Sequence, residues 1–295
     1  MSKNPLSQLS DFGQSFWYDN IQRSLLLNGE MKKMIDEDDV RGVTSNPSIF
    51  EKAIANSNDY DQSLMSLVSD KQKLNSREAF FSLAIEDIQM ACDLLKPVYD
   101  KTQAVDGYVS LEVSPDLAHD TEASIKEAQA LFIRLARPNA MIKIPATQAG
   151  IPVIERLVAD GINVNATLLF SAERYIEVAK AYIRGLTARH QRGLPIDNIA
   201  SVASFFMSRV DVKLDQCLAK VNDQESATLL MGKMGIINAK IAYLEFLDLF
   251  ESDEFKALQK AGAHPQRLLW ASTGTKNPAL SDVLYVESLI GENTV

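Results

Sequence analysis

Short β-branched runs alternate with longer amphipathic segments along this chain. Of all the features of the sequence, this alternation most strongly limits the folds that the chain can adopt. A strand followed by a helix, repeated many times, is typical of α/β proteins with a parallel sheet. The strand candidates are 16–20 (FWYDN), 40–45 (VRGVTS), 107–113 (GYVSLEV), 140–145 (AMIKIP), 162–168 (INVNATL), 199–204 (IASVAS), 267–272 (RLLWAS) and 283–288 (VLYVES). Eight such units predict a (β/α)8 TIM barrel with extra helices. A doubly wound α/β sheet is the alternative, disfavoured by the strand number and the missing GxGxxG motif.

The length of 295 residues fits one barrel domain spanning residues 1–295, although two smaller domains also fit this length. Only LIGENTV follows the eighth strand candidate, which is too short for a closing helix. We therefore expect a barrel without its C-terminal helices. Such a gap would expose apolar surface, which predicts low stability or an intermolecular cover.

Capping and breaking residues predict where several helices begin and end. Asn75 and Glu78 form a capping box for a helix that we expect to end at Pro97. Thr121 is expected to cap a helix that stops before Pro138. Three further helical segments are predicted: one from Pro152 to Gly161, one from Ser171 toward Gly193, and two or three helices within 209–258.

Composition excludes several classes of protein. Lys and Arg number 30 against 39 Asp and Glu, a net charge of −9 that argues against a nucleic-acid binder. No apolar run approaches the roughly 18 residues that span a bilayer, and the N-terminus lacks a signal-peptide core. The two cysteines and three histidines have no disulfide-framework or metal-site spacing, so no metal is expected and the cytoplasm is the default location.

One charged residue interrupts the apolar strand candidate MIKIPA. Lys143 stands between Ile142 and Ile144, where alternation places it on the opposite face, inside the barrel. A strand lysine is more often at an edge or extends its ammonium to solvent. The surrounding pattern nevertheless favours an interior position.

Polar residues occupy the ends of six successive strand candidates: Asp19, Asn46, Glu112, Lys143, Asn165 with Thr167, and Ser204. Each has a structural explanation, such as a turn at Asn46 before Pro47 or an ion pair of Glu112 with Lys143. Active sites of barrels gather at these strand ends, so together the residues indicate a lined pocket. A desolvated lysine favours its neutral, nucleophilic amine, which can form a Schiff base with a carbonyl while carboxylates move protons.

Six segments in this order resemble the transaldolase family, specifically its longer bacterial branch. They are GVTSNPSIF (42–50), SLEVSP (110–115), IKIPAT (142–147), GINVNATLLFS (161–171), ASFFMSRVD (203–211) and WASTGTKNP (270–278). The resemblance covers nearly the whole chain.

The resemblance implies transfer of a dihydroxyacetone unit between ketose and aldose phosphates in the pentose phosphate pathway, without a metal or organic cofactor. Lys143 would form the Schiff base with C2 of fructose 6-phosphate or sedoheptulose 7-phosphate. Asp19 would take the C4 hydroxyl proton, and Glu112 would transfer protons through a water that Thr167 helps to hold. Asn46, Asn165 and Ser204 would bind the dihydroxyacetone portion. A homodimer is the assembly expected from the family.

The resemblance also implies a phosphate site. Arg209 and Ser272 match family phosphate-binding residues, and Arg209 lies near the N-terminus of a predicted helix, a natural anion site. Many relatives have a basic residue where this chain has Gly274, so Lys276 is expected to replace it; otherwise it is a solvated loop charge.

Two other activities remain open. Relatives that release free dihydroxyacetone have a tyrosine where this chain has Phe206, so Phe206 favours transfer over release unless it only packs the barrel. The second alternative is a truncated barrel that binds sugar phosphates without processing them, which the short C-terminus would explain.

Overall fold

The strands form one parallel sheet with the order of the sequence. The computed structural model describes residues 4–69 and 75–295, and these contain seven strands paired in the order β1 to β7. The strands are β1 (Phe16–Tyr18), β2 (Val40–Val43), β3 (Tyr108–Glu112), β4 (Ala140–Pro145), β5 (Val164–Leu169), β6 (Ser201–Phe206) and β7 (Arg267–Ala271). Every pairing is parallel, as a TIM-barrel-like α/β fold requires.

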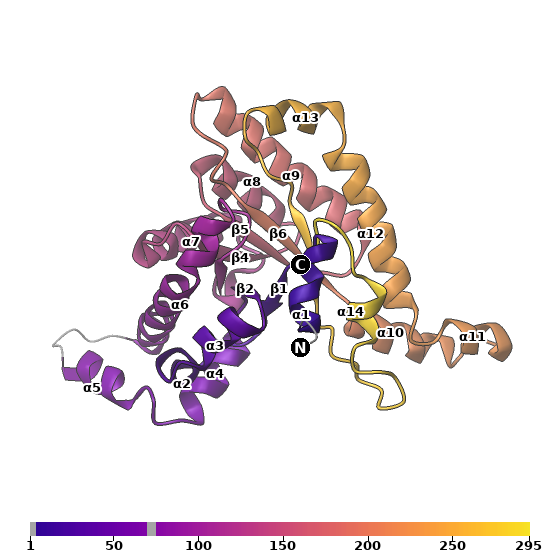
Figure 1. Cartoon of the computed structure of the whole chain (residues 1–295), viewed down its shortest axis with the longest axis horizontal. Coiled ribbons are helices and arrows are strands. Elements are labelled where there is room, and N and C mark those ends of the chain that lie inside the picture. Colours follow the sequence, from indigo (N-terminus) through magenta and orange to yellow (C-terminus); the bar gives the residue numbers. More distant parts are fainter. Residues whose placement is uncertain (1–3, 70–74) are drawn as a thin grey trace.

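Helices follow the strands and cover the outside of the sheet. They are α1 (Pro5–Gln8), η1 (Leu9–Phe12), α2 (Arg23–Leu27), α3 (Glu30–Glu37), α4 (Pro47–Ala55), α5 (Asp61–Ser69), α6 (Ser76–Lys101), η2 (Pro115–Leu117), α7 (Thr121–Leu135), α8 (Gly150–Asp160), α9 (Ala172–Gln191), α10 (Ser208–Leu218), α11 (Gln224–Leu230), α12 (Met234–Phe250), α13 (Asp253–Lys260) and α14 (Leu284–Ser288). Figure 1 shows α6, α7, α8, α9 and α12 in an arc around the strands, while α5 and α11 project outward. Among the described residues, no helix has both the length and the apolar character needed to cross a membrane.

The predicted eighth strand, 283–288, is wrong, because this segment forms the short helix α14. Tyr285 and Leu289 are both buried, and a spacing of four residues puts them on one helical face. The Tyr285 hydroxyl donates a 2.6 Å hydrogen bond to Asp211, a long-range contact that fixes α14 to α10.

The last three residues lie between β7 and β1, where a closed barrel has its eighth strand. Asn293 N donates to Gly13 O and Ser15 N donates to Thr294 O, so the segment contacts the chain just before β1. On the other side, Val295 N donates to Leu268 O at 2.8 Å, and Trp270 N donates to Val295 O at 2.9 Å. Both bridges of Thr294, to Gln14 and to Leu268, are parallel.

Most helix signals act as the sequence predicts. The Asn75–Glu78 capping box is present, Gly161 ends α8 with a φ of 91°, and Ser171 caps α9. Pro97 does not end α6, which continues to Lys101, and the partly buried Val98 of this last turn packs against the core. Asp120 caps α7 in place of Thr121, since the Asp120 carboxylate accepts from Ala123 N.

The segment 209–258 forms more helices than predicted. In the described chain it lies within α10, α11, α12 and α13, which makes four helices instead of two or three. Asp223 and Ser252 each cap a new helix with a side-chain oxygen, and these caps divide the segment.

Two apolar clusters lie on the two faces of the sheet. The outer cluster packs strand residues such as Ile142 and Ile144 against the helices. The inner cluster fills the barrel near the amino ends of the strands with Trp17, Tyr108, Met141, Ala200, Val202, Leu269 and Val295. Because side chains alternate along a strand, Met141 and Lys143 share the inner face of β4, opposite Ile142 and Ile144.

Candidate active site

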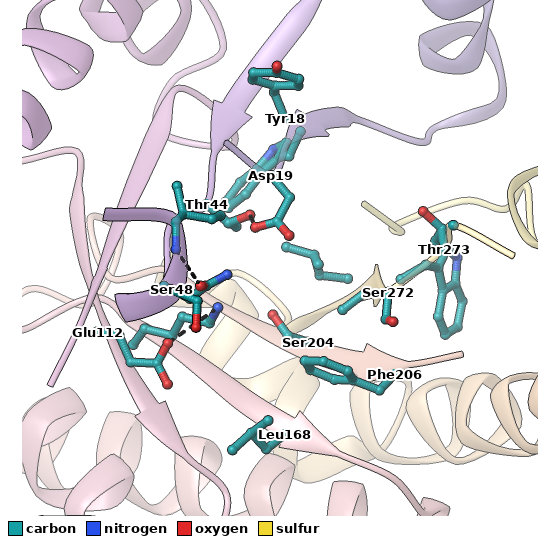
Figure 2. A pocket seen from close by; sticks show the side chains of 18 of the residues that line it. Tyr18, Asp19, Thr44, Ser48, Glu112, Leu168, Ser204, Phe206, Ser272 and Thr273 are labelled. Carbon is teal, nitrogen blue, oxygen red and sulfur yellow. Dashed lines mark hydrogen bonds and ion pairs between the residues drawn. The ribbon is translucent and has the colours of Figure 1, made fainter. Parts of the chain in front are cut away.

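A cavity of about 880 Å³ opens at the carboxyl ends of the strands. Nine of the eleven predicted site residues line it: Asp19, Asn46, Glu112, Lys143, Ser204, Phe206, Arg209, Ser272 and Lys276. They come from widely separated parts of the sequence, and Figure 2 shows Asp19, Glu112, Ser204, Phe206 and Ser272 bordering one space. The fold therefore collects the polar strand ends into one pocket.

Lys143 lies inside the barrel, as the alternation of β4 predicts, and is only 6% exposed. Its Nζ donates a 3.2 Å hydrogen bond to the Ser45 carbonyl oxygen and lies 3.7 Å from Glu112 Oε2. The register of the sheet explains this proximity, because Glu112 on β3 and Asn165 on β5 are the direct partners of Lys143. One rung of the sheet thus aligns a carboxylate, an amine and an amide.

Glu112 has an environment suited to proton transfer. Burial raises the pKa of its carboxyl, the nearby Lys143 ammonium lowers it, and the charge of Asp19 raises it; the net direction is upward. A carboxyl with a raised pKa keeps its proton closer to neutral pH and can act as both acid and base.

Asp19 immediately follows β1, because the strand ends at Tyr18 instead of residue 20 as predicted. Its carboxylate is accessible from the cavity and accepts a 2.6 Å hydrogen bond from the Thr44 hydroxyl. Figure 2 shows the two side chains next to each other. Thr44 comes from the adjacent strand end, so it fixes the orientation of Asp19 across the β1–β2 junction.

Asn46 caps a helix and also borders the cavity, so its structural role does not exclude a role in the site. Its side-chain oxygen caps α4 by accepting a hydrogen bond from Ile49 N at 3.0 Å. The same side chain borders the cavity, and the cap restricts its rotamer.

Asn165 and Thr167 do not line the cavity but lie directly behind its wall. Asn165 is fully buried; its amide nitrogen donates to Ser110 Oγ at 3.1 Å, and its oxygen accepts from the Ser204 hydroxyl at 2.8 Å. Thr167 is also buried, and its hydroxyl is without a hydrogen-bond partner among the described residues. The register of β5 shifts between Ala166 and Leu169, so Leu168, at a φ of 61°, lines the cavity.

A group of cationic and hydroxyl side chains gathers at the ends of β6 and β7. Arg209 lies in the first turn of α10, as predicted, with its guanidinium 5.1 Å from the centre of the Phe206 ring. That ring also contacts Phe170 at a centroid distance of 5.3 Å. A methyl group built on Gly274 would lie 3.9 Å from Lys276 Nζ, so the Lys276 ammonium occupies the space beside Gly274.

Sequence reasoning missed several residues of the site. Thr44, Ser45 and Ser110 directly precede or support the predicted residues, and Lys52, Leu168 and Thr273 also border the cavity. Thr44 and Ser45 directly precede Asn46 in the motif TSNPS, so this motif could have predicted them as site residues. Leu168 had no signal, because a bulge in β5 determines its direction.

Comparison with known proteins agrees with the resemblance. The family model described as Transaldolase/Fructose-6-phosphate aldolase matches residues 16–295. The chain is 50% identical over 302 residues to a protein of Trichodesmium erythraeum named Transaldolase, and 49% identical over 303 residues to Transaldolase 2 of a Nostoc species; each match covers 100% of this chain and 79% of the relative. It is 48% identical over 292 residues to a Transaldolase of Thermobifida fusca, covering 99% of this chain and 78% of that protein. This chain therefore belongs to the transaldolase/fructose-6-phosphate aldolase family.

Proposed function

We propose that this protein is a transaldolase, which transfers a dihydroxyacetone unit from a ketose phosphate to an aldose phosphate through a Schiff base on Lys143. The observation that carries the proposal is the position of Lys143 Nζ inside the barrel, 3.7 Å from Glu112 and in the cavity that Asp19 also lines. The specific reaction is sedoheptulose 7-phosphate with glyceraldehyde 3-phosphate giving erythrose 4-phosphate and fructose 6-phosphate.

The first half of the reaction forms the covalent intermediate. The neutral amine of Lys143 attacks the C2 carbonyl of the ketose, and Glu112 supplies the proton that converts the carbonyl oxygen to a hydroxyl. The carbinolamine nitrogen then returns a proton to Glu112, which passes it to the hydroxyl. The hydroxyl leaves as water and gives the protonated imine. We assign Thr167 to holding the water through which Glu112 acts, since its buried hydroxyl lies beside this rung of the sheet.

The second half breaks and remakes a carbon–carbon bond. Asp19 takes the proton of the C4 hydroxyl, the C3–C4 bond breaks, and the aldose phosphate leaves as an aldehyde. The electron pair of the broken bond moves into the imine and produces an enamine, which resonance stabilises. The enamine then attacks the acceptor aldehyde, and the same steps run in reverse.

The other predicted residues would hold the substrate. Asn46, Asn165 and Ser204 border or support the part of the cavity next to Lys143, where the dihydroxyacetone hydroxyls would lie. Arg209, Ser272 and Lys276 would bind the phosphate at the far end. Both substrates have one phosphate, so one such site serves each in turn.

Phe206 favours transfer over release of free dihydroxyacetone, the second candidate reaction. Its ring borders the cavity and has no hydroxyl with which to protonate the enamine. The enamine would therefore persist until an acceptor aldehyde arrives. Product analysis separates the two reactions, because only transfer needs an acceptor for turnover.

Reductive trapping tests the proposal directly. The protein is incubated with fructose 6-phosphate, reduced with borohydride, and searched by mass spectrometry for an adduct on Lys143. We expect an adduct on this residue, and we expect Lys143→Ala to lose it together with nearly all transfer activity. A folded protein that forms no adduct would point to a sugar-phosphate binder and reject the proposal.

We also propose one domain spanning residues 1–295 and a cytoplasmic location, both from the sequence pattern, and a homodimer on the family resemblance. Size-exclusion chromatography with light scattering tests the assembly. A monomer at micromolar concentration would contradict the homodimer.

A further inference from the structure

Ser208, the first residue of α10, joins the end of β6 to the end of β7. It is 1% exposed and makes three contacts with Ser272. Its backbone N–H donates to the Ser272 carbonyl at 3.2 Å, its hydroxyl donates to the same carbonyl at 2.7 Å, and the two hydroxyl oxygens are 2.9 Å apart. Ser208 therefore holds both the backbone and the side chain of Ser272.

Ser272 requires such support because its backbone has a φ of 56°. This left-handed conformation is disfavoured for residues other than glycine and persists where neighbouring contacts hold it. The conformation lies at the point where the chain leaves β7, so it determines where the Ser272 hydroxyl and the following loop enter the cavity.

A second contact fixes the other end of this loop. Asp211, also in α10, accepts hydrogen bonds from the Tyr285 hydroxyl and from Gly235 N, both at 2.6 Å. Tyr285 is buried in α14, which follows the loop that includes Lys276. The first turns of α10 thus hold the loop at residue 272 and again at residue 285.

We propose that Ser208 is a positioning residue that presents Ser272, and through the loop Lys276, to the phosphate end of the sugar substrates. The proposal rests on the function proposed above and assigns a role to a residue that does not line the cavity. Ser208 would act together with Arg209, the next residue, so that two consecutive residues of α10 serve one phosphate.

The hydrogens of the two hydroxyls indicate how the pair would respond to a phosphate. Ser208 donates its single hydrogen to the Ser272 carbonyl, so in the free protein its oxygen can accept the hydrogen of the Ser272 hydroxyl. A bound phosphate would draw the Ser272 hydrogen toward its own oxygen. The bond from Ser208 to the Ser272 carbonyl would remain and would keep the strained backbone in place.

The test compares two acceptors that differ only in the phosphate, glyceraldehyde 3-phosphate and glyceraldehyde. Fructose 6-phosphate is held at a concentration that saturates each variant, because the phosphate of this donor uses the same site. We expect Ser208→Ala to raise KM for glyceraldehyde 3-phosphate about tenfold, the scale of one buried hydrogen bond, with kcat within about twofold of the parent. Transfer to glyceraldehyde should not change. Tyr285→Phe, which removes the second contact, should shift KM in the same direction by about threefold.

Ser201→Ala is the matched control. Ser201 is a buried serine at the opposite end of β6, and its hydroxyl donates to the Val164 carbonyl at 2.7 Å. It should affect both acceptors equally, and circular dichroism should show that all three variants are folded.

A Ser208→Ala variant with unchanged KM for both acceptors, or with equal losses for both, overturns the positioning role. Failure of the proposed function has a different signature, because the parent protein would then show no Lys143 adduct and no transfer to either acceptor.

Discussion

Replacing Glu112 by Gln tests the proton-transfer step without changing the shape of the site. Gln preserves the size of the side chain but cannot give up or take up the proton that imine formation needs. Removing a positioned general acid–base group slows its step by about 10²–10⁴-fold, and carbinolamine formation and dehydration both depend on Glu112 in the proposed mechanism. We therefore expect formation of the Lys143 adduct to slow by at least about 10²-fold.

The structure explains why this loss should be large. The carboxylate lies 3.7 Å from Lys143 Nζ, within reach of the reacting atoms through one water, and burial raises the pKa of Glu112. Among the carboxylates that line the cavity, Asp19 is attached to another strand end and bonded to Thr44, so it is poorly placed to substitute for Glu112.

Rapid quenching with borohydride, followed by mass spectrometry, measures adduct formation on Lys143 as a function of time. Asp116→Asn is the control, because Asp116 is an exposed carboxylate four residues away that pairs with Arg77 and does not line the cavity. The pH profile of adduct formation should lose its Glu112-dependent limb in Glu112→Gln and keep it in Asp116→Asn. If Glu112→Gln were less stable but formed the adduct at the parent rate, Glu112 would be only a structural partner of Lys143, and the reasoning would be refuted.

Three further predictions address other parts of the fold. Thr44→Val removes the hydrogen bond to Asp19, so C3–C4 cleavage should slow about tenfold while adduct formation stays unchanged; equal slowing of both steps would contradict a specific effect on Asp19. Burial alone would raise the pKa of Asp106, but the charge of Arg267 and hydrogen bonds from Arg267, Ser15 and Trp17 outweigh it and lower that pKa from 3.8. The stability that the lowered pKa gives is present above pH 3.8 and is lost as the pH falls below it. The free energy of urea unfolding of Asp106→Asn should therefore depend less on pH between about 2 and 4 than that of the parent. An equal pH dependence in the variant and the parent would contradict this. Gly185→Ala would put a methyl group 2.7 Å from the Glu155 carbonyl oxygen, where α9 packs on α8. This contact should lower the free energy of unfolding by about 1–3 kcal/mol. Helix propensity alone predicts the opposite, a rise in the free energy of unfolding of about 1 kcal/mol.

Strand positions could be predicted from the sequence because the pattern that defines them is local. The β4 segment matches its predicted bounds, and the other strands differ from their predictions by one or two residues at one or both ends. The segment 283–288 shows where this reasoning fails. Its apolar residues suit a strand as well as a helix. The contact of Tyr285 with Asp211, more than 70 residues away in the sequence, is not contained in the local pattern.

The same difference between local pattern and long-range contact separates the residues around Lys143 from the residues expected to bind phosphate. Glu112, Lys143 and Asn165 could be predicted together because strand alternation and parallel register place them on one rung. Thr167 fits the alternation too, yet its distance from the cavity surface depends on the bulge beside Leu168. The phosphate residues belong to a loop and a helix terminus, whose positions follow from tertiary contacts such as Ser208 with Ser272.

Two buried pairs of opposite charge lie at opposite ends of the barrel. Asp106 and Arg267 form a 2.7 Å ion pair at the amino ends, with hydrogen bonds from Ser15 and Trp17. Glu112 and Lys143 lie at the carboxyl ends, and the inner apolar cluster, including Met141, lies between. Direct partners lower the pKa of the Asp106 carboxyl, whereas Glu112 and Lys143 are 3.7 Å apart and the pKa of the Glu112 carboxyl is raised. The Asp106 carboxylate is thus fixed by direct contacts at one end of the barrel. At the other end the raised pKa of Glu112 favours its protonated form near Lys143, as the proposed proton transfer requires.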